Sequence, residues 1–272
     1  MPSMDISIVP PPVVSQPVLL GILWSGSIFS LLVLSTRLEI RRRIYSTLKT
    51  DDYLVICAWV LSLATTILWT ILRDDLYASL AAADSVASLN EVLDEAGTML
   101  RGMLASDILS WTCLWSVKLS FMAFFYPLGK QIKSQRMLWW GVIGFILIGY
   151  LVCVGTLDYE CLTSRGLDIL NICSKRRVID WEYAALRTIT AMDVVTDALI
   201  VMVPGSIVWR VHIAWRKKLA LTGICCLTIV MIVAAILRIA ICSTGKKPDV
   251  SWWLVWNSVE TTLGTTAPQY LA

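Results

Sequence analysis

The sequence predicts an all-α fold, a bundle of seven transmembrane helices in a polytopic membrane protein. Hydrophobic residues make up 57% of the 272 residues, the mean hydropathy is +0.71, and the chain has 13 Trp but only one His. Soluble domains carry fewer apolar residues and more charge than this. Seven apolar stretches are also long enough for a helix to cross the hydrocarbon core, which takes about 20 residues. The lipid bilayer is therefore the first partner that we expect for the chain.

The seven predicted spans follow one another along most of the chain. We place them at Pro17 to Thr36, Tyr53 to Leu72, Ala105 to Leu128, Met137 to Thr156, Thr188 to Trp209, Leu219 to Cys242 and Ser251 to Ala272. The fifth and the seventh are interrupted by polar residues and proline, which neighbouring helices can accommodate in a membrane: Asp193, Asp197, Pro204, Asn257, Glu260 and Pro268. The chain thus divides into a short outer N-terminal segment, residues 1–16, and a seven-helix membrane domain, residues 17–272.

Basic residues beside the spans predict the orientation of the chain in the membrane. The loops on one side carry twelve Lys and Arg against three Asp and Glu, whereas the loops on the other side carry nine against thirteen. Cytoplasmic loops are enriched in Lys and Arg. We therefore expect the N-terminus on the outer or lumenal side and the C-terminus at the cytoplasmic face. The net charge of +3 reflects this topology and does not indicate binding to nucleic acid.

Two of the predicted outer loops have distinctive patterns. The loop from Arg73 to Leu104 alternates apolar and acidic residues with an imperfect helical period, which fits either an interfacial helix or a solvated loop. The loop from Leu157 to Arg187 contains Cys161 and Cys173, with eleven residues between them. A disulfide forms and persists on an oxidising face of the membrane. We therefore predict a Cys161 to Cys173 disulfide.

Five charged residues lie well inside the apolar spans, away from their ends: Lys118, Asp193, Asp197, Arg238 and Glu260. A charge in hydrocarbon is costly, so such residues normally face the bundle interior and find a partner there. Depths counted along each helix at 1.5 Å per residue place Lys118 within reach of Asp197, and Arg238 within reach of Glu260 or Asp193. The five residues form either interhelical ion pairs that hold the bundle together or an outward-facing polar pocket for a small ligand or substrate.

Several motifs recur together in a characteristic order. They are Asp51-Asp52-Tyr53 at the start of the second span, Lys118-Leu119-Ser120 in the third, Cys161 and Cys173 in the outer loop, Asp197 seven residues before Pro204, the turn Arg216-Lys217-Lys218, Arg238, and Glu260 with Pro268. In this order the chain resembles the fungal rhodopsin-like domain family from about Pro17 to Ala272. That family includes integral membrane proteins of fungal secondary-metabolite clusters, such as the satratoxin cluster, and receptor-like proteins of plant-pathogenic fungi.

The residues themselves exclude several functions that the resemblance suggests. A retinal protein needs a lysine in its last helix for the Schiff base, and there is none from Ser251 to Ala272. The single histidine, His212, excludes a multi-histidine metal site. Asp193 and Asp197 share a helix face, but a lone pair of this kind is too common to predict a metal site. The sequence has no glycine-rich phosphate loop and no Ser-His-Asp arrangement. We expect no cofactor and no metal.

Two classes of function remain open. In the first, the chain is a sensor or accessory membrane protein of fungal secondary metabolism that binds a small lipophilic molecule. In the second, it is a membrane-embedded biosynthetic enzyme, a cyclase or isomerase, in which Asp197 or Glu260 donates a proton as the general acid in a dry pocket. The sequence contains no catalytic motif that decides whether the chain is an enzyme.

Overall fold

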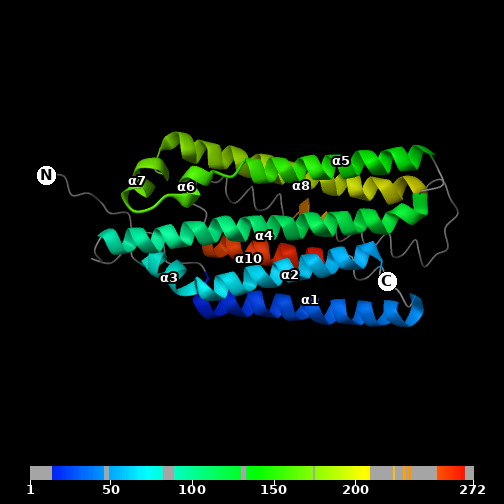
Figure 1. The fold of residues 1–272 in the computed structure, drawn as a ribbon, viewed down its shortest axis with the longest axis horizontal. Coiled ribbons are helices and arrows are strands. Elements are labelled where there is room, and N and C mark those ends of the chain that lie inside the picture. Colours follow the sequence, from blue (N-terminus) through cyan, green and yellow to red (C-terminus); the bar gives the residue numbers. More distant parts are fainter. Residues whose placement is uncertain are drawn as a thin grey trace.

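The computed structural model describes residues 14–45, 49–81, 89–129, 133–173, 175–208 and 250–266, with isolated positions between 223 and 233. Every element in these ranges is an α-helix, which confirms the all-α class for this part of the chain (Figure 1). The long helices are α1 (Gln16–Tyr45), α2 (Thr50–Ile71), α4 (Leu89–Gly129), α5 (Lys133–Gly155), α8 (Arg176–Val208) and α10 (Val250–Thr266). Three short helices are α3 (Arg73–Ala81), α6 (Tyr159–Thr163) and α7 (Leu167–Cys173).

Four of the described helices are long and apolar enough to cross a membrane, and they match the first four predicted spans. They are Gln16–Arg43, Thr50–Ile71, Ala96–Pro127 and Lys133–Gly155. The fifth and seventh predicted spans correspond to α8 and α10, which are helical but carry more polar residues. Most of the sixth predicted span, Leu219 to Cys242, lies outside the described residues, so the count of seven stays a prediction.

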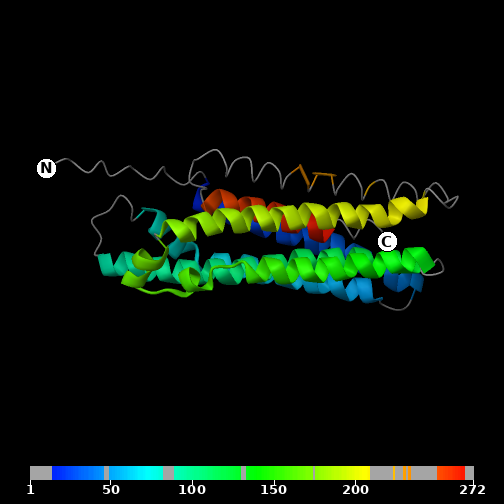
Figure 2. The same cartoon turned by 90° about the horizontal axis from the view of Figure 1, so that it is seen from above.

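The long helices run along a common axis and α4 lies at their centre (Figures 1 and 2). Helix α4 packs against α2, α5, α8 and α10, and α1 packs against α2 and α10. Seen from above, α8 and α10 form one layer over a second layer that contains α4 and α5 (Figure 2). This arrangement places side chains of α4 where they can meet those of nearly every other long helix.

Apolar packing holds these layers together in two clusters of buried side chains. One lies between α4, α5 and α8 and includes Trp115, Phe125 and Ile146. Its helices approach closely at Gly149, where an added Cβ would stand 2.5 Å from the Trp115 ring. The other cluster joins α1, α2, α3 and α10 and includes Trp69 and Leu254. Small residues let membrane helices pack tightly in this way.

Apolar side chains also cover the outside of the bundle. On α1 and α5 the exposed ones include Ile28, Leu32, Trp140, Ile148 and Leu151. A large exposed apolar surface of this kind is typical of a protein that contacts lipid. The sequence and the outer surface therefore agree on a membrane protein.

The segment from Arg73 to Leu104, predicted as an outer loop, is largely helical in its described residues. Helix α3 covers Arg73–Ala81, and α4 begins at Leu89 rather than at the predicted start of the third span, Ala105. The added length of α4 packs against α3, α6 and α7, and a Cβ at Gly97 would meet Ile169 of α7 at 3.6 Å. Helices thus form in the described parts of this segment, and Leu76 of α3 and Gly97 of α4 are buried against the rest of the chain.

The short helices α6 and α7 are joined by the Cys161 to Cys173 disulfide, with the two Cα atoms 5.1 Å apart. The predicted pairing is confirmed. Asp158 caps α6, since its carboxylate accepts a hydrogen bond from the Cys161 N–H at 3.2 Å. Gly166 has φ of 55°, a left-handed conformation that glycine adopts without a Cβ penalty, and it lets the chain turn back into α7.

We predict that this disulfide forms in the protein made by cells. Non-reducing peptide mapping of protein purified from membranes should recover the peptides of Cys161 and Cys173 linked. Replacing both with serine should speed hydrogen exchange in α6 and α7 and cost about 2 to 4 kcal/mol at that end of the molecule, because the unfolded chain is then less constrained. The matched control is Cys57→Ser, which changes an exposed free cysteine. Alkylation of both Cys161 and Cys173 without prior reduction would contradict the prediction.

Candidate functional site

A buried cluster of charged and hydroxyl groups joins α4 to α8. The Lys118 Nζ atom lies 2.7 Å from Asp193 Oδ1 and 3.0 Å from Asp197 Oδ1. It also donates to the Thr196 hydroxyl at 2.7 Å and to the Asp193 backbone carbonyl at 3.1 Å. The three side chains that carry charge are 7%, 13% and 12% exposed, so lysine and carboxylates are held largely away from solvent.

Helix geometry explains why these groups converge. Asp193, Thr196 and Asp197 stand three and four residues apart, so they share the face of α8 that meets α4. On α4, Trp115 lies one turn before Lys118, and the ammonium sits 5.0 Å from the centre of its ring. An aromatic face attracts a cation at this distance. The Lys118 ammonium is thus surrounded by oxygen atoms on one side and a tryptophan ring on the other.

Among the described residues, the charges in this cluster do not balance. Two carboxylates face one ammonium there, which leaves one formal negative charge when both acids are ionised. Charged groups away from water interact strongly, and an uncompensated one is costly. The cluster can therefore accept a further hydrogen-bond donor or positive group.

The structure brings together three of the five predicted site residues. The expected contact of Lys118 with Asp197 is present, but Asp193, which we had placed at the level of Arg238, contacts Lys118 as well. The depth count went wrong because it started from the ends of apolar stretches, whereas α4 and α8 begin well before them, at Leu89 and Arg176. Arg238 lies outside the described residues.

Glu260 occupies a different place in the bundle. It lies on α10, is 3% exposed, and is not among the groups that contact Lys118. Its neighbour Thr261 lines a small cavity between α1, α2, α4 and α10. The lining of this cavity includes none of the five predicted site residues. Glu260 and Lys118 do not contact each other, and the predicted link between them through Arg238 lies outside the described residues.

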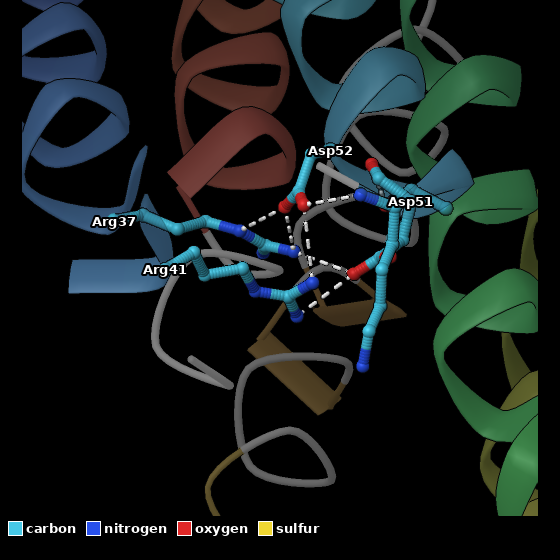
Figure 3. Close-up of polar contacts among 6 residues, drawn as sticks. Arg37, Arg41, Asp51 and Asp52 are labelled. Atoms are coloured by element: carbon cyan, nitrogen blue, oxygen red, sulfur yellow. Dashed lines mark hydrogen bonds and ion pairs between the residues drawn. The ribbon is translucent and has the colours of Figure 1, made fainter. Parts of the chain in front are cut away.

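A second buried charge cluster, formed by Arg37, Arg41, Asp51 and Asp52, was not predicted as a site (Figure 3). The Arg37 guanidinium lies 2.8 Å from Asp51 and 3.0 Å from Asp52, and that of Arg41 lies 2.8 Å and 3.2 Å from the same two carboxylates. All four side chains are at most 6% exposed. Two positive and two negative charges balance one another here.

Local structure builds this second cluster. Arg37 and Arg41 are one turn apart in the C-terminal part of α1. Asp51 and Asp52 lie in the first turn of α2, where they complement the dipole of that helix. The Asp52 carboxylate accepts from the Lys49 N–H at 3.0 Å and caps α2. Ser120 of α4 donates to the Asp51 carbonyl at 3.2 Å. The spacing of the two arginines and the paired aspartates is a usable signal, but from the sequence we used the arginines only for the charge count of the loops and the aspartates also for the family resemblance.

The charged groups limit which metals and cofactors the site can bind. Among the described residues no group of three or more His, Cys, Asp and Glu side chains could hold a metal ion. Asp193 and Asp197 direct oxygen atoms to Lys118 instead. Lys118 in turn has its ammonium engaged by four oxygen atoms, which leaves its nitrogen poorly placed to act as a nucleophile.

Comparisons with known proteins agree with the helical architecture. The fungal rhodopsin domain matches residues 36–268 of the chain. Fugralins biosynthesis cluster protein 2 of Gibberella zeae is 26% identical over 149 residues, which are 52% of this chain and 36% of that protein. The match thus spans about a third of the length of the curated relative. No solved structure matches the chain.

We predict that Lys118 is needed to keep Asp193 and Asp197 buried. Lys118→Met should lower the free energy of unfolding by about 3 to 5 kcal/mol, because it leaves two carboxylates unpaired. Replacing all three, Lys118→Met with Asp193→Leu and Asp197→Leu, should regain most of the loss. The matched control is Arg43→Met, which breaks an ion pair with Glu39 whose side chains are 78% and 56% exposed, and it should cost at most about 1 kcal/mol.

Denaturant or SDS titration of the purified protein, followed by circular dichroism, measures these differences. A Lys118→Met variant as stable as the Arg43→Met control would show that the cluster does not hold α4 to α8.

Proposed function

Because the chain belongs to the fungal rhodopsin domain family, we propose that it is a seven-helix membrane protein of fungal secondary metabolism that binds a small lipophilic molecule as a sensor or accessory protein. The relative from Gibberella zeae bears the name of a biosynthesis cluster protein, which supports the metabolic setting. The observation that carries the binding proposal is the unbalanced Lys118, Asp193 and Asp197 cluster in the bundle interior.

The imbalance suggests what kind of molecule the cluster would recognise. A buried ion pair contributes little net stability compared with apolar packing. The second carboxylate of the cluster, its third buried charge, therefore does not serve stability, and ligand binding would explain its presence. A hydroxyl or amine group of a ligand could donate a hydrogen bond to the second carboxylate, while the surrounding side chains of α4, α5 and α8 contact its apolar part. This ligand class is a small apolar molecule with at least one polar hydrogen.

Retinal does not fit the proposal. A retinal Schiff base forms on an uncharged lysine nitrogen, and the last predicted span has no lysine. The Lys118 ammonium is already engaged by Asp193, Asp197 and Thr196. We therefore propose a function that does not use light.

A membrane-embedded cyclase or isomerase is the second candidate, and the structure favours one of its two general acids. Asp197 Oδ1 lies 3.0 Å from the Lys118 ammonium, so this oxygen is already engaged in an ion pair. Glu260 is buried, and Thr261, the next residue along the chain, lines the cavity between α1, α2, α4 and α10. In this alternative Glu260 is the better candidate to donate the proton.

We also propose that the end of the bundle with α6 and α7 faces outward or into a lumen. The Cys161 to Cys173 disulfide lies at that end, whereas Arg37 and Arg41 lie toward the other end, near the turn between α1 and α2 (Figure 1). Disulfides belong to the oxidising side and clustered arginines to the cytoplasmic side. These two features support the same orientation, with the N-terminus outside and the C-terminus in the cytoplasm.

The function is tested by deleting the gene and profiling metabolites. We expect the amount of a secondary metabolite to change without accumulation of a precursor, and the native gene to restore it. The Lys118→Met, Asp193→Leu, Asp197→Leu variant should be stable yet fail to restore it, whereas Arg43→Met should restore it fully. An accumulated precursor would favour the enzyme, and an unchanged metabolite profile would contradict both candidates.

The orientation is tested by placing a glycosylation acceptor at either end of the bundle. An acceptor inserted after Gly166, in the turn between α6 and α7, should be modified when the protein is made in a eukaryotic cell. The same acceptor inserted between α4 and α5, at residues 130–132, should stay unmodified. The opposite pattern would reverse the proposed orientation.

A further inference from the structure

The small cavity between α1, α2, α4 and α10 is lined by hydroxyl and amide groups as well as by apolar side chains. Its lining includes Ser27, Ser62, Thr66, Ser110 and Asn257 together with Leu23 and Leu254. The cavity does not include Lys118, Asp193 or Asp197, so it is separate from the ligand site proposed above. We propose that it binds one ordered water molecule, which bridges α2, α4 and α10.

Hydrogen-bond accounting points to a missing partner in this cavity. Ser110 is fully buried and accepts a hydrogen bond from the Asn257 amide at 3.0 Å. A serine hydroxyl can also donate, yet among the described residues nothing accepts from Ser110. The Ser62 and Ser258 hydroxyls have no hydrogen-bond partner in the same part of the chain, and both line the cavity. Groups on three helices are therefore left with hydrogen bonds to make.

Other hydroxyls around the cavity are already satisfied. The Ser27 and Thr66 hydroxyls lie 2.9 Å apart, and either can donate to the other. Thr66 can also donate to the Ser62 backbone carbonyl, 3.1 Å away. Thr261 donates to the carbonyls of its own helix at Asn257 and Ser258. Hydrogen bonds thus remain to be made at Ser62, Ser110, Asn257, Ser258 and Thr262, which together offer the two to four partners that a buried water normally has.

The size of the cavity selects water over a larger ligand. The space open to the centre of a water molecule is about 10 Å³, close to the smallest cavity that holds one water. Apolar cavities of this size stay empty, whereas polar ones are filled because their groups would otherwise lack partners. Water inside a membrane protein replaces hydrogen bonds that the hydrocarbon cannot supply.

This water would complete the attachment of α10 to the rest of the bundle. Helix α10 already contacts α1 through the Ser30 and Thr265 hydroxyls, 3.1 Å apart, and through a close approach of Gly26 to Thr262. The Asn257 to Ser110 bond attaches it to α4. A bridging water would add a connection to α2. Polar contacts would then join α10 to α1, α2 and α4.

The direct test is a high-resolution structure of the full chain in lipid nanodiscs. We expect a density peak within about 3.2 Å of the Ser110 hydroxyl and the Asn257 amide. A cavity that is empty, or that a side chain or lipid fills while the lining residues are well ordered, would overturn the proposal.

Melting temperatures of two variants give an independent test. Ser110→Ala should lower the melting temperature by about 2 to 4 °C, whereas the control Ser116→Ala, which changes an α4 serine that bonds to its own helix at Thr112, should not. Ser62→Val fills the cavity with methyl groups, so it should lower the melting temperature if it displaces a bound water. A rise in melting temperature for Ser62→Val would show that the cavity is dry.

Discussion

The cost of an unpaired charge away from water is the constraint on which the rest of this bundle depends. Lys118 can remain buried only if α8 places Asp193 and Asp197 beside it, and Arg37 and Arg41 only if α2 begins with two carboxylates at their level. Each requirement fixes how far one helix can slide or rotate against its neighbour. Apolar contacts alone tolerate small shifts, because a leucine can pack against many surfaces. The charged clusters therefore set the register of the helix pairs, and the apolar side chains fill the space between them.

The two clusters differ in charge balance, and this difference separates structure from function. The four groups of the Arg37, Arg41, Asp51 and Asp52 cluster neutralise one another near the cytoplasmic end of the bundle as we propose it. Counted over the described residues, the Lys118 cluster has one negative charge in excess and lies beside aromatic and aliphatic side chains of α4, α5 and α8. An excess of buried charge favours a further partner. This contrast is why we assign the binding role to the Lys118 cluster.

Helix α10 is attached in a third way, through hydroxyl and amide groups. Its contacts at Ser30 and Thr265 and at Ser110 and Asn257 are single neutral hydrogen bonds. Such bonds between membrane helices contribute little each, on the order of 0.6 kcal/mol. Helix α10 also carries the buried Glu260, and the next residue, Thr261, lines the small cavity. In the enzyme alternative, Glu260 is the candidate proton donor.

The sequence by itself determined the all-α class and the Cys161 to Cys173 pairing. It also placed the majority of the ends of four apolar helices to within one helical turn. These properties are local: hydropathy decides which segments enter a membrane, and the short separation of two cysteines on one face limits their partners. Sequence also picked out Lys118, Asp193 and Asp197, since a charge inside an apolar span stands out. Only the tertiary structure decided that all three meet, that Glu260 lies apart from them, and that Arg37, Arg41, Asp51 and Asp52 are buried rather than solvated. The reason is that pairing depends on where helices begin and how they are rotated against each other, and those quantities are set by contacts between distant segments such as α4 with α6 and α7.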